Sequence, residues 1–170
     1  MNIKKITISI IAIFLLSVVT HSMYNWFPNK IVALFFPVNE SIWEHNKMIV
    51  TTFIIWSIIE KIIYKNSSIL YNIISAIICC ILVTTVFGFI YFFILKTKDN
   101  IFVALSIYFI AIVISQIINY LVLNKKVYKD ELLGVFISII LIIINAFLTF
   151  NPIHNDLFYD FKYNHYGIKK

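Results

Sequence analysis

At residues 37–45 the chain reads Pro37-Val38-Asn39-Glu40-Ser41-Ile42-Trp43-Glu44-His45, immediately before a long apolar run. Ser41 and Glu44 have the S-x-x-E spacing of a capping box, in which the serine covers a free amide and the glutamate reaches back. Asn39 is a competing N-cap, and it would place Glu40 in the first turn, where the helix dipole favours an acid. In either register the stretch predicts the start of a long helix, marked by two carboxylates and an imidazole.

The composition of the whole chain is far more apolar than that of a soluble domain. Of its 170 residues, 61% are hydrophobic and 13% are charged, and the mean hydropathy is +0.92. The apolar residues form blocks of about twenty, the length that a helix needs to cross ~30 Å of hydrocarbon. The blocks are continuous rather than alternating, which indicates helices rather than strands. We therefore expect an all-α, polytopic integral membrane protein.

Turns and charged loops divide the chain into a bundle of about five transmembrane helices, which form a single domain over residues 1–170. The expected spans are residues 4–23, 42–64, 69–95, 101–123 and 132–150, and residues 151–170 form a polar tail. Residues 1–19 also fit a signal peptide, but the segment Val18–Ser22 lacks a small-x-small cleavage pair, so we take the first span as retained. Between the first two spans, Pro28 and Pro37 bracket an apolar segment that is too short to cross, which predicts a short interfacial or re-entrant segment.

The net charge of +6 is carried by lysine alone, because the sequence contains no arginine. The lysines lie in short loops and termini beside the apolar blocks, where they anchor to lipid headgroups and set topology, so we expect no nucleic-acid partner. Five spans divide the lysines seven against seven between the two sides, and we give Lys4 and Lys5, beside the first span, the greater weight. This predicts a cell-membrane protein with a cytoplasmic N-terminus and an extracytoplasmic C-terminus.

An odd number of spans places residues 24–47 and the tail at the same membrane face. The four histidines of the chain and four of its acids then lie at that face: His21, His45, His154, His165, Glu40, Glu44, Asp156 and Asp160. In a chain with so few polar residues, this segregation is the main functional clue. It predicts a compact polar cap made of residues 24–47 and the tail.

Two kinds of chemistry are candidates at this polar cap. Glu40 and Glu44, four residues apart, would share a helix face, and a carboxylate pair in a low dielectric raises the pKa of one member, as a general acid or base requires. With His45 they form the candidate catalytic set. Alternatively, His21, His45 and His154 would ligate a divalent metal such as zinc, with Glu44 activating water. The spacing matches no metal-binding motif such as H-E-x-x-H.

A structural interpretation of the same residues stays open. Ser41 and Glu44 make a good helix start on their own, and Trp26 and Trp43 fit an aromatic belt at headgroup level. A cap of this kind favours a structural or accessory protein that binds the lipid bilayer, a membrane-protein partner or a second copy of the chain.

A third functional class is a small transporter. Gln116 and Asn119 lie about one turn apart in the fourth expected span and would share a face that lines a solute path. Amides inside a span are more often glue between helices. The chain also lacks the internal repeat of most secondary transporters, so transport is the weaker hypothesis.

At residues 39–45, Asn39-Glu40-Ser41-Ile42-Trp43-Glu44-His45, the chain resembles an uncharacterised family of small bacterial multi-pass membrane proteins, classed as a domain of unknown function. The resemblance runs over the full length and includes the aromatic segment His21–Phe27 and the tail residues Tyr166-Gly167-Ile168. In that family a Pro-x-x-Gly-type turn follows the acid of the tail, whereas here Asp160 is followed by Phe161-Lys162-Tyr163-Asn164. The resemblance implies the membrane architecture and assigns no activity.

Overall fold

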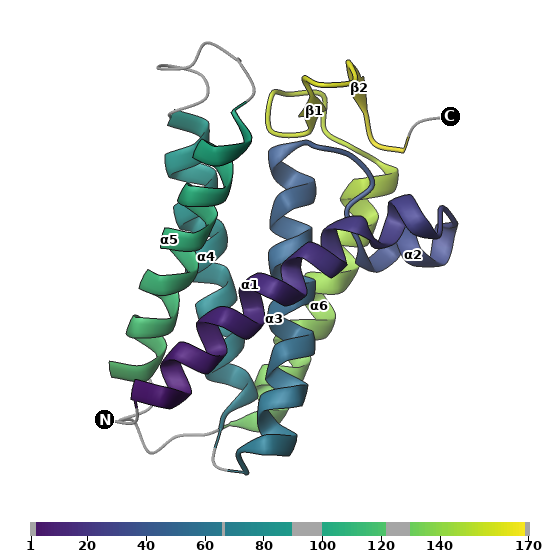
Figure 1. Cartoon of the computed structure of the whole chain (residues 1–170). Coiled ribbons are helices and arrows are strands. Elements are labelled where there is room, and N and C mark those ends of the chain that lie inside the picture. The colour runs from purple at the N-terminus through teal and green to yellow at the C-terminus, as the bar shows by residue number, and fades with distance from the viewer. Residues whose placement is uncertain (1–2, 66, 90–99, 122–129, 169–170) are drawn as a thin grey trace.

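The computed structural model of the chain describes residues 3–65, 67–89, 100–121 and 130–168. Within these residues, five long helices and one short helix form a bundle, and a small hairpin follows the last helix (Figure 1). The helices are α1 (Ile3–Trp26), α2 (Lys30–Phe35), α3 (Ile42–Ile63), α4 (Ile69–Phe89), α5 (Ile101–Leu121) and α6 (Glu131–Phe150), and the strands are β1 (Tyr159–Asp160) and β2 (His165–Tyr166). The predicted all-α class is confirmed apart from the hairpin, which the sequence did not suggest.

The five long helices occupy the segments in which spans were expected, with ends that differ from the expected limits by a few residues. Four of them, α1, α4, α5 and α6, are long and apolar enough to cross a membrane, over Ile69–Val86 in the case of α4. These four helices are consistent with a membrane protein. Residues 90–95 of the expected third span and residues 122–123 of the expected fourth span lie outside the described residues.

Helix α3 differs from the other long helices because it carries four charged residues: Glu44, Lys47, Glu60 and Lys61. It packs against α1, α4 and α6, and more than half of its residues are buried. Glu44, Lys47 and Glu60 are among the buried ones. A buried charge is tolerated only with a partner, and each of these three has one inside the bundle, as described below.

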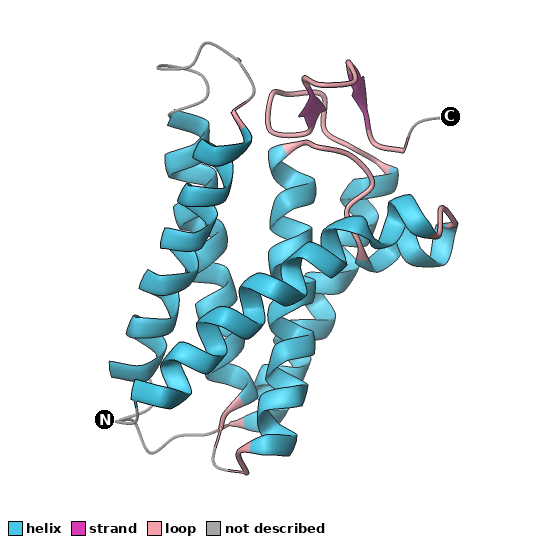
Figure 2. Ribbon diagram, in the orientation of Figure 1, coloured by secondary structure: helices cyan, strands magenta, loops and turns pink. Residues whose placement is uncertain are grey.

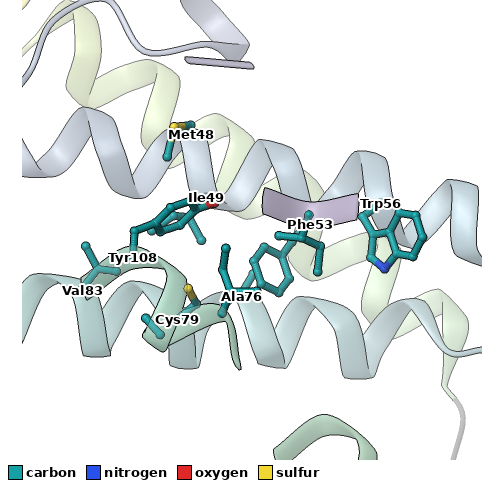
Figure 3. Packing of buried hydrophobic residues seen from close by; sticks show 11 residues of the cluster. Met48, Ile49, Phe53, Trp56, Ala76, Cys79, Val83 and Tyr108 are labelled. Carbon is teal, nitrogen blue, oxygen red and sulfur yellow. The ribbon is translucent and has the colours of Figure 1, made fainter. Parts of the chain in front are cut away.

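The apolar core lies between α1, α3, α4 and α5 (Figure 3). Its members are Ile13, Met48, Ile49, Phe53, Trp56, Ala76, Cys79, Val83, Tyr108, Ala111 and Ile112. Small residues let helices approach closely, which strengthens the van der Waals packing between them. Helices α6 and α4 approach closely at Gly134, where a Cβ atom would lie 2.5 Å from the backbone nitrogen of Leu70. A larger residue at this position would force the two helices apart.

Ser41 caps α3, as the S-x-x-E spacing predicted. Its Oγ accepts a hydrogen bond from the backbone amide of Glu44 at 3.3 Å. The other half of the capping box does not form, because Asn39 Oδ1 accepts the bond from the Ser41 amide at 2.9 Å, while Glu44 Oε2 accepts from the Val38 amide at 3.1 Å. The helix begins directly after Ser41, so Asn39 is not its N-cap.

The short helix α2 is held to α3 by two side chains that bond to its last carbonyl groups. A helix leaves its last four carbonyls without helical partners. Lys47 Nζ donates to the Ala33 carbonyl at 3.0 Å, and Thr51 Oγ1 donates to the Phe35 carbonyl at 2.5 Å. Ala33 is fully buried while Ile31 is exposed, so α2 has one inward and one outward face.

The tail folds back over the start of α3 (Figure 2). The strands β1 and β2 are antiparallel, with Tyr159 opposite Tyr166 and Asp160 opposite His165. Asn164 closes the turn between them with a positive φ of 56°, a conformation that asparagine tolerates better than most residues. The expected meeting of the 24–47 segment with the tail is confirmed by the bonds described next.

Candidate functional site

The buried carboxylate of Asp160 joins the tail to the segment before α3. Its Oδ2 accepts a hydrogen bond from the backbone amide of Glu40 at 2.9 Å. Its Oδ1 accepts from the backbone amides of Lys162 and Tyr163 at 2.9 and 3.0 Å. Asn39 adds a second link, since its Nδ2 donates to the Gly167 carbonyl at 2.9 Å. These bonds fix the position of Glu40 relative to the hairpin.

Trp43 makes a further contact between α3 and the tail. Its backbone amide donates to the Leu157 carbonyl at 2.9 Å, and its ring stacks on Phe158 with centroids 4.8 Å apart. Because the ring is engaged with the tail, Trp43 serves in packing the cap. Trp26, at the end of α1, is 57% exposed and does not share in this packing.

Three side chains from three parts of the chain meet beside this junction. His21 lies near the end of α1, Glu40 in the segment before α3, and His45 in the first turns of α3. Glu40 Oε2 is 3.5 Å from His21 Nε2 and 3.7 Å from His45 Nε2. The imidazole centroids are 5.5 Å apart. One ligand atom from each residue lies within 4.8 Å of the other two, a grouping able to hold a metal ion.

The orientation of the His45 ring is set by its own helix. Its Nδ1 lies 2.8 Å from the Ser41 carbonyl, which is an acceptor, so Nδ1 carries a proton. In a neutral imidazole the lone pair is then on Nε2, the atom nearest Glu40. A lone pair facing a carboxylate is repulsive unless a proton or a metal cation lies between them. The arrangement therefore has the polarity of a cation site.

Glu40 is an anion at neutral pH. The hydrogen bond from the His21 side chain lowers its pKa to about 2, against the opposing effect of burial, and the charges of His45, His21 and Lys162 act in the same direction as the bond. The Lys162 ammonium lies 4.0 Å from Glu40 Oε1. The expectation that Glu40 shares a helix face with Glu44 is wrong, because Glu40 precedes α3. Its pKa is lowered rather than raised because its neighbours are imidazoles and a lysine.

Glu44 lies in a separate, buried network. Its Oε2 is 2.6 Å from Lys47 Nζ and its Oε1 accepts from Thr149 Oγ1 at 2.6 Å. Lys47 also donates to Thr149 Oγ1 at 2.7 Å. Glu44 is 2% exposed and Lys47 1%. The network ties α3 to α6, and it occupies both oxygens of the carboxylate that was expected to activate water.

The two tail histidines lie in different surroundings. His154, an expected metal ligand, is exposed and stacks on Tyr166, with centroids 4.6 Å apart and planes 6° apart. The structure does not bring it to the group of His21, Glu40 and His45. His165 lines the same cavity as His21 and Glu40. The sequence pattern placed both histidines at the cap but could not separate them, because it did not reveal the hairpin.

An open cavity of ≈ 250 Å³ adjoins the three residues. It lies between the end of α1, the 37–40 segment and the hairpin, and its walls include His21, Tyr24, Glu40, Tyr163 and His165. Two of the three candidate metal ligands therefore face a space of small-molecule size.

A second polar network lies at the other end of the bundle. Glu60 is bonded by Asn72 Nδ2 at 2.6 Å and paired with Lys5 Nζ at 3.3 Å, and Asn119 Nδ2 donates to Asn72 Oδ1 at 2.9 Å. Gln116 lines a small cavity of ≈ 10 Å³ with these residues, about the space of one water molecule. The network links α1, α3, α4 and α5, as expected of polar glue between helices.

A family model described as "Family of unknown function (DUF6512)" matches residues 1–168. No curated protein and no solved structure matches the chain.

Proposed function

The chain belongs to the DUF6512 family of unknown function, and we propose that it is an integral membrane protein that binds a divalent transition metal, such as zinc, at one membrane face. The proposed ligands are His21, Glu40 and His45. The observation that carries this proposal is the convergence of their three ligand atoms within 4.8 Å of one another, from segments far apart in the sequence.

The donor set and its spacing support zinc or a similar ion. Two imidazoles and one carboxylate are the protein ligands of many catalytic zinc sites, which keep a fourth position open. In a tetrahedral site with bonds of about 2.0–2.1 Å, neighbouring donor atoms are about 3.3–3.4 Å apart. Glu40 Oε2 is 3.5 and 3.7 Å from the two Nε2 atoms, close to this spacing, and the ligand atoms of the two imidazoles lie within 4.8 Å of each other and would draw together around the ion. The bond from His45 Nδ1 to the Ser41 carbonyl is the second contact that metal-bound histidines usually make.

We propose that α3 is a fifth span in addition to the four apolar helices. Its length and the pairing of its buried charges inside the bundle support this assignment. The outward face of α2, with Ile31 72% exposed, supports the interfacial segment. The start of α1 and the hairpin lie at opposite ends of the bundle (Figure 1), as five spans require. With Lys4 and Lys5 cytoplasmic, the metal site would be extracytoplasmic.

In this proposal Glu44 is a structural residue rather than a catalytic one. Its bonds to Lys47, Thr149 and the Val38 amide hold the start of α3, which carries His45, against α6 and the preceding loop. Metal-assisted hydrolysis would then depend on a water or substrate at the open metal position. His154 stacks on Tyr166 and is not one of the proposed metal ligands.

An accessory role is the second candidate function, and one observation favours it. Trp26, Phe27 and Ile31 are exposed together around the end of α1 and the start of α2. Aromatic and aliphatic side chains in this position suit the headgroup region of a bilayer or a membrane-protein partner. An accessory protein of this kind would keep its partner when the metal ligands are removed and lose it on Trp26→Ala.

The metal site is tested by the metal content of the purified protein. We expect wild-type protein in detergent, exchanged into a zinc-containing buffer and then desalted, to retain one equivalent of zinc by mass spectrometry. Glu40→Gln and His45→Ala should retain little. His154→Ala is the matched control, because this histidine belongs to the same cap but lies outside the site. Equal zinc in all four proteins, each with a wild-type circular dichroism spectrum, would remove the proposal.

A further inference from the structure

The cavity beside His21 and Glu40 has one wall built from the tail. His165 and Tyr163 line it on the hairpin side. The hairpin is fixed to the opposite wall by a direct bond, because the fully buried Asp160 accepts from the Glu40 amide and from two amides of the hairpin turn. The distance between the metal ligands and His165 is therefore set by folding.

His165 has an unused hydrogen-bonding atom. Its Nδ1 is buried and has no hydrogen-bond partner among the described residues. A buried polar atom without a partner costs about 1–3 kcal/mol. A rotation of the His165 ring towards the cavity that it lines would remove this cost by presenting Nδ1 to a ligand there. The backbone pairing of His165 with Asp160 keeps this ring at the cavity.

The charge around the cavity is positive once a metal is bound. Two neutral imidazoles and one carboxylate leave a divalent ion with a net charge of one, and Lys162 adds an ammonium group near Glu40. Glu40 is the only acid among the described residues that line the cavity, and the metal would use it. Tyr24 and Tyr163 add hydroxyl donors. An oxygen ligand with negative charge matches this lining best.

From these observations we infer that the cavity binds a phosphate group, as inorganic phosphate or as the phosphomonoester headgroup of a lipid. One phosphate oxygen takes the open metal position and another accepts a hydrogen bond from His165. The volume of ≈ 250 Å³ lies just below the range of drug-sized sites and suits a group of this size. This inference rests on the proposed metal site, to which it adds the ligand class and the role of His165 as a ligand-positioning residue.

The experiment uses cobalt as a visible probe of the metal site. The full-length protein in detergent is loaded with Co²⁺, freed of excess metal and titrated with inorganic phosphate while its visible absorption is recorded. We expect a saturable change of the cobalt bands in wild type and in His154→Ala. His165→Ala should need at least about tenfold more phosphate, the loss expected for one bond to a charged group. His165→Gln, which keeps a donor, should recover part of the affinity.

The outcomes separate the two proposals. If wild-type protein takes up no Co²⁺, both the metal site and the phosphate site are overturned. If Co²⁺ binds and neither inorganic phosphate nor phosphatidic acid changes its bands, the phosphate inference fails while the metal site stands. Equal phosphate affinity in His165→Ala and His154→Ala would remove the role of His165. Should His165→Ala aggregate, the His165→Gln titration still decides, because wild-type affinity or a complete loss of response would contradict the expected partial recovery.

Two further samples distinguish the source of the phosphate group. Cobalt-loaded protein in phosphatidic acid nanodiscs presents phosphomonoesters, and protein in phosphatidylcholine nanodiscs presents only phosphodiesters. A shift of the cobalt bands in phosphatidic acid alone would assign a lipid headgroup. A shift only after added inorganic phosphate would assign the free ion. A lack of response in every sample would overturn the inference.

Discussion

The carboxylate of Asp160 accepts a hydrogen bond from the backbone amide of Glu40 at 2.9 Å, across 120 residues of sequence. Asp160 is fully buried and belongs to β1, while Glu40 carries the carboxylate of the proposed metal site. The bond therefore connects the conformation of the tail to the position of a metal ligand. Loss of the tail anchor and loss of metal affinity should be coupled.

Replacement of Asp160 tests this coupling. We expect Asp160→Ala to destabilise the protein by at least about 2 kcal/mol, because three backbone amides lose a charged acceptor. It should also weaken zinc binding, because Glu40 is no longer held. Thermal unfolding in detergent and zinc titration measure the two effects. Asp156→Asn, a change at an exposed acid of the same tail, is the control and should alter neither.

The Glu44–Lys47 pair makes the second prediction. Removing one member leaves a buried charge without its partner, which typically costs about 3–5 kcal/mol. Glu44→Gln and Lys47→Met should each destabilise strongly, and the double variant should be more stable than the sum of the two losses implies. A double-mutant cycle on unfolding free energies measures this. A stable Glu44→Gln that has lost a metal-dependent activity would instead make Glu44 catalytic.

The third prediction concerns pH. The pKa of Glu40 is about 2 in the folded protein, below its ordinary value of 4.5. A lowered carboxyl pKa stabilises the fold above the unfolded-state value, and this contribution is lost as the pH falls through the folded value. In metal-free protein, the destabilisation caused by Glu40→Gln should therefore be full above pH 4.5 and shrink as the pH falls towards 2. Unfolding midpoints at several pH values test it, and a constant difference would contradict the ionised state of Glu40.

The direction of insertion is testable by chemical labelling. In a background with Cys79 and Cys80 replaced by serine, Asn155→Cys places a thiol in the exposed tail and Lys65→Cys places one at the opposite end of the bundle. A membrane-impermeant maleimide applied to intact cells should label the first and spare the second until the cells are permeabilised. Labelling of Lys65→Cys alone would invert the proposed orientation.

The sequence predicted the helices well because their signal is local. Hydropathy marks four of the five long helices over about twenty residues each, and the Ser41 cap that starts the fifth depends on a contact three residues away. The sequence also predicted that the histidines share one end of the bundle, because an odd number of spans places residues 24–47 and the tail on the same side. The sequence could not predict that Glu40 and Glu44 belong to two separate networks. Their separation depends on where α3 begins, to within one turn, and on a hydrogen bond from Thr149, which lies more than a hundred residues away.

The hairpin was beyond the reach of the sequence for a different reason. Its strands have two residues each, too few for an alternating pattern, and it is held by the side chain of Asp160 and by contacts with α3 rather than by strand propensity. Since the hairpin alone decides which tail histidine lines the cavity, His165 could not be chosen over His154 from the sequence. The one signal in the sequence is an aspartate directly before two aromatic residues, in Asp160-Phe161-Lys162-Tyr163.

The last prediction separates helix glue from a transport path at the other end of the bundle. Asn119 donates to Asn72, which in turn bonds Glu60, whereas Gln116 Nε2 is buried without a hydrogen-bond partner among the described residues. Asn119→Leu should therefore destabilise the protein by about 0.5–2 kcal/mol, and Gln116→Leu should be neutral or stabilising. Thermal unfolding of the two variants in detergent measures this difference. If these amides instead line a path, both variants should stop flux into proteoliposomes, measured with zinc as the solute, whatever their stability, because polar groups inside a span mark solute paths.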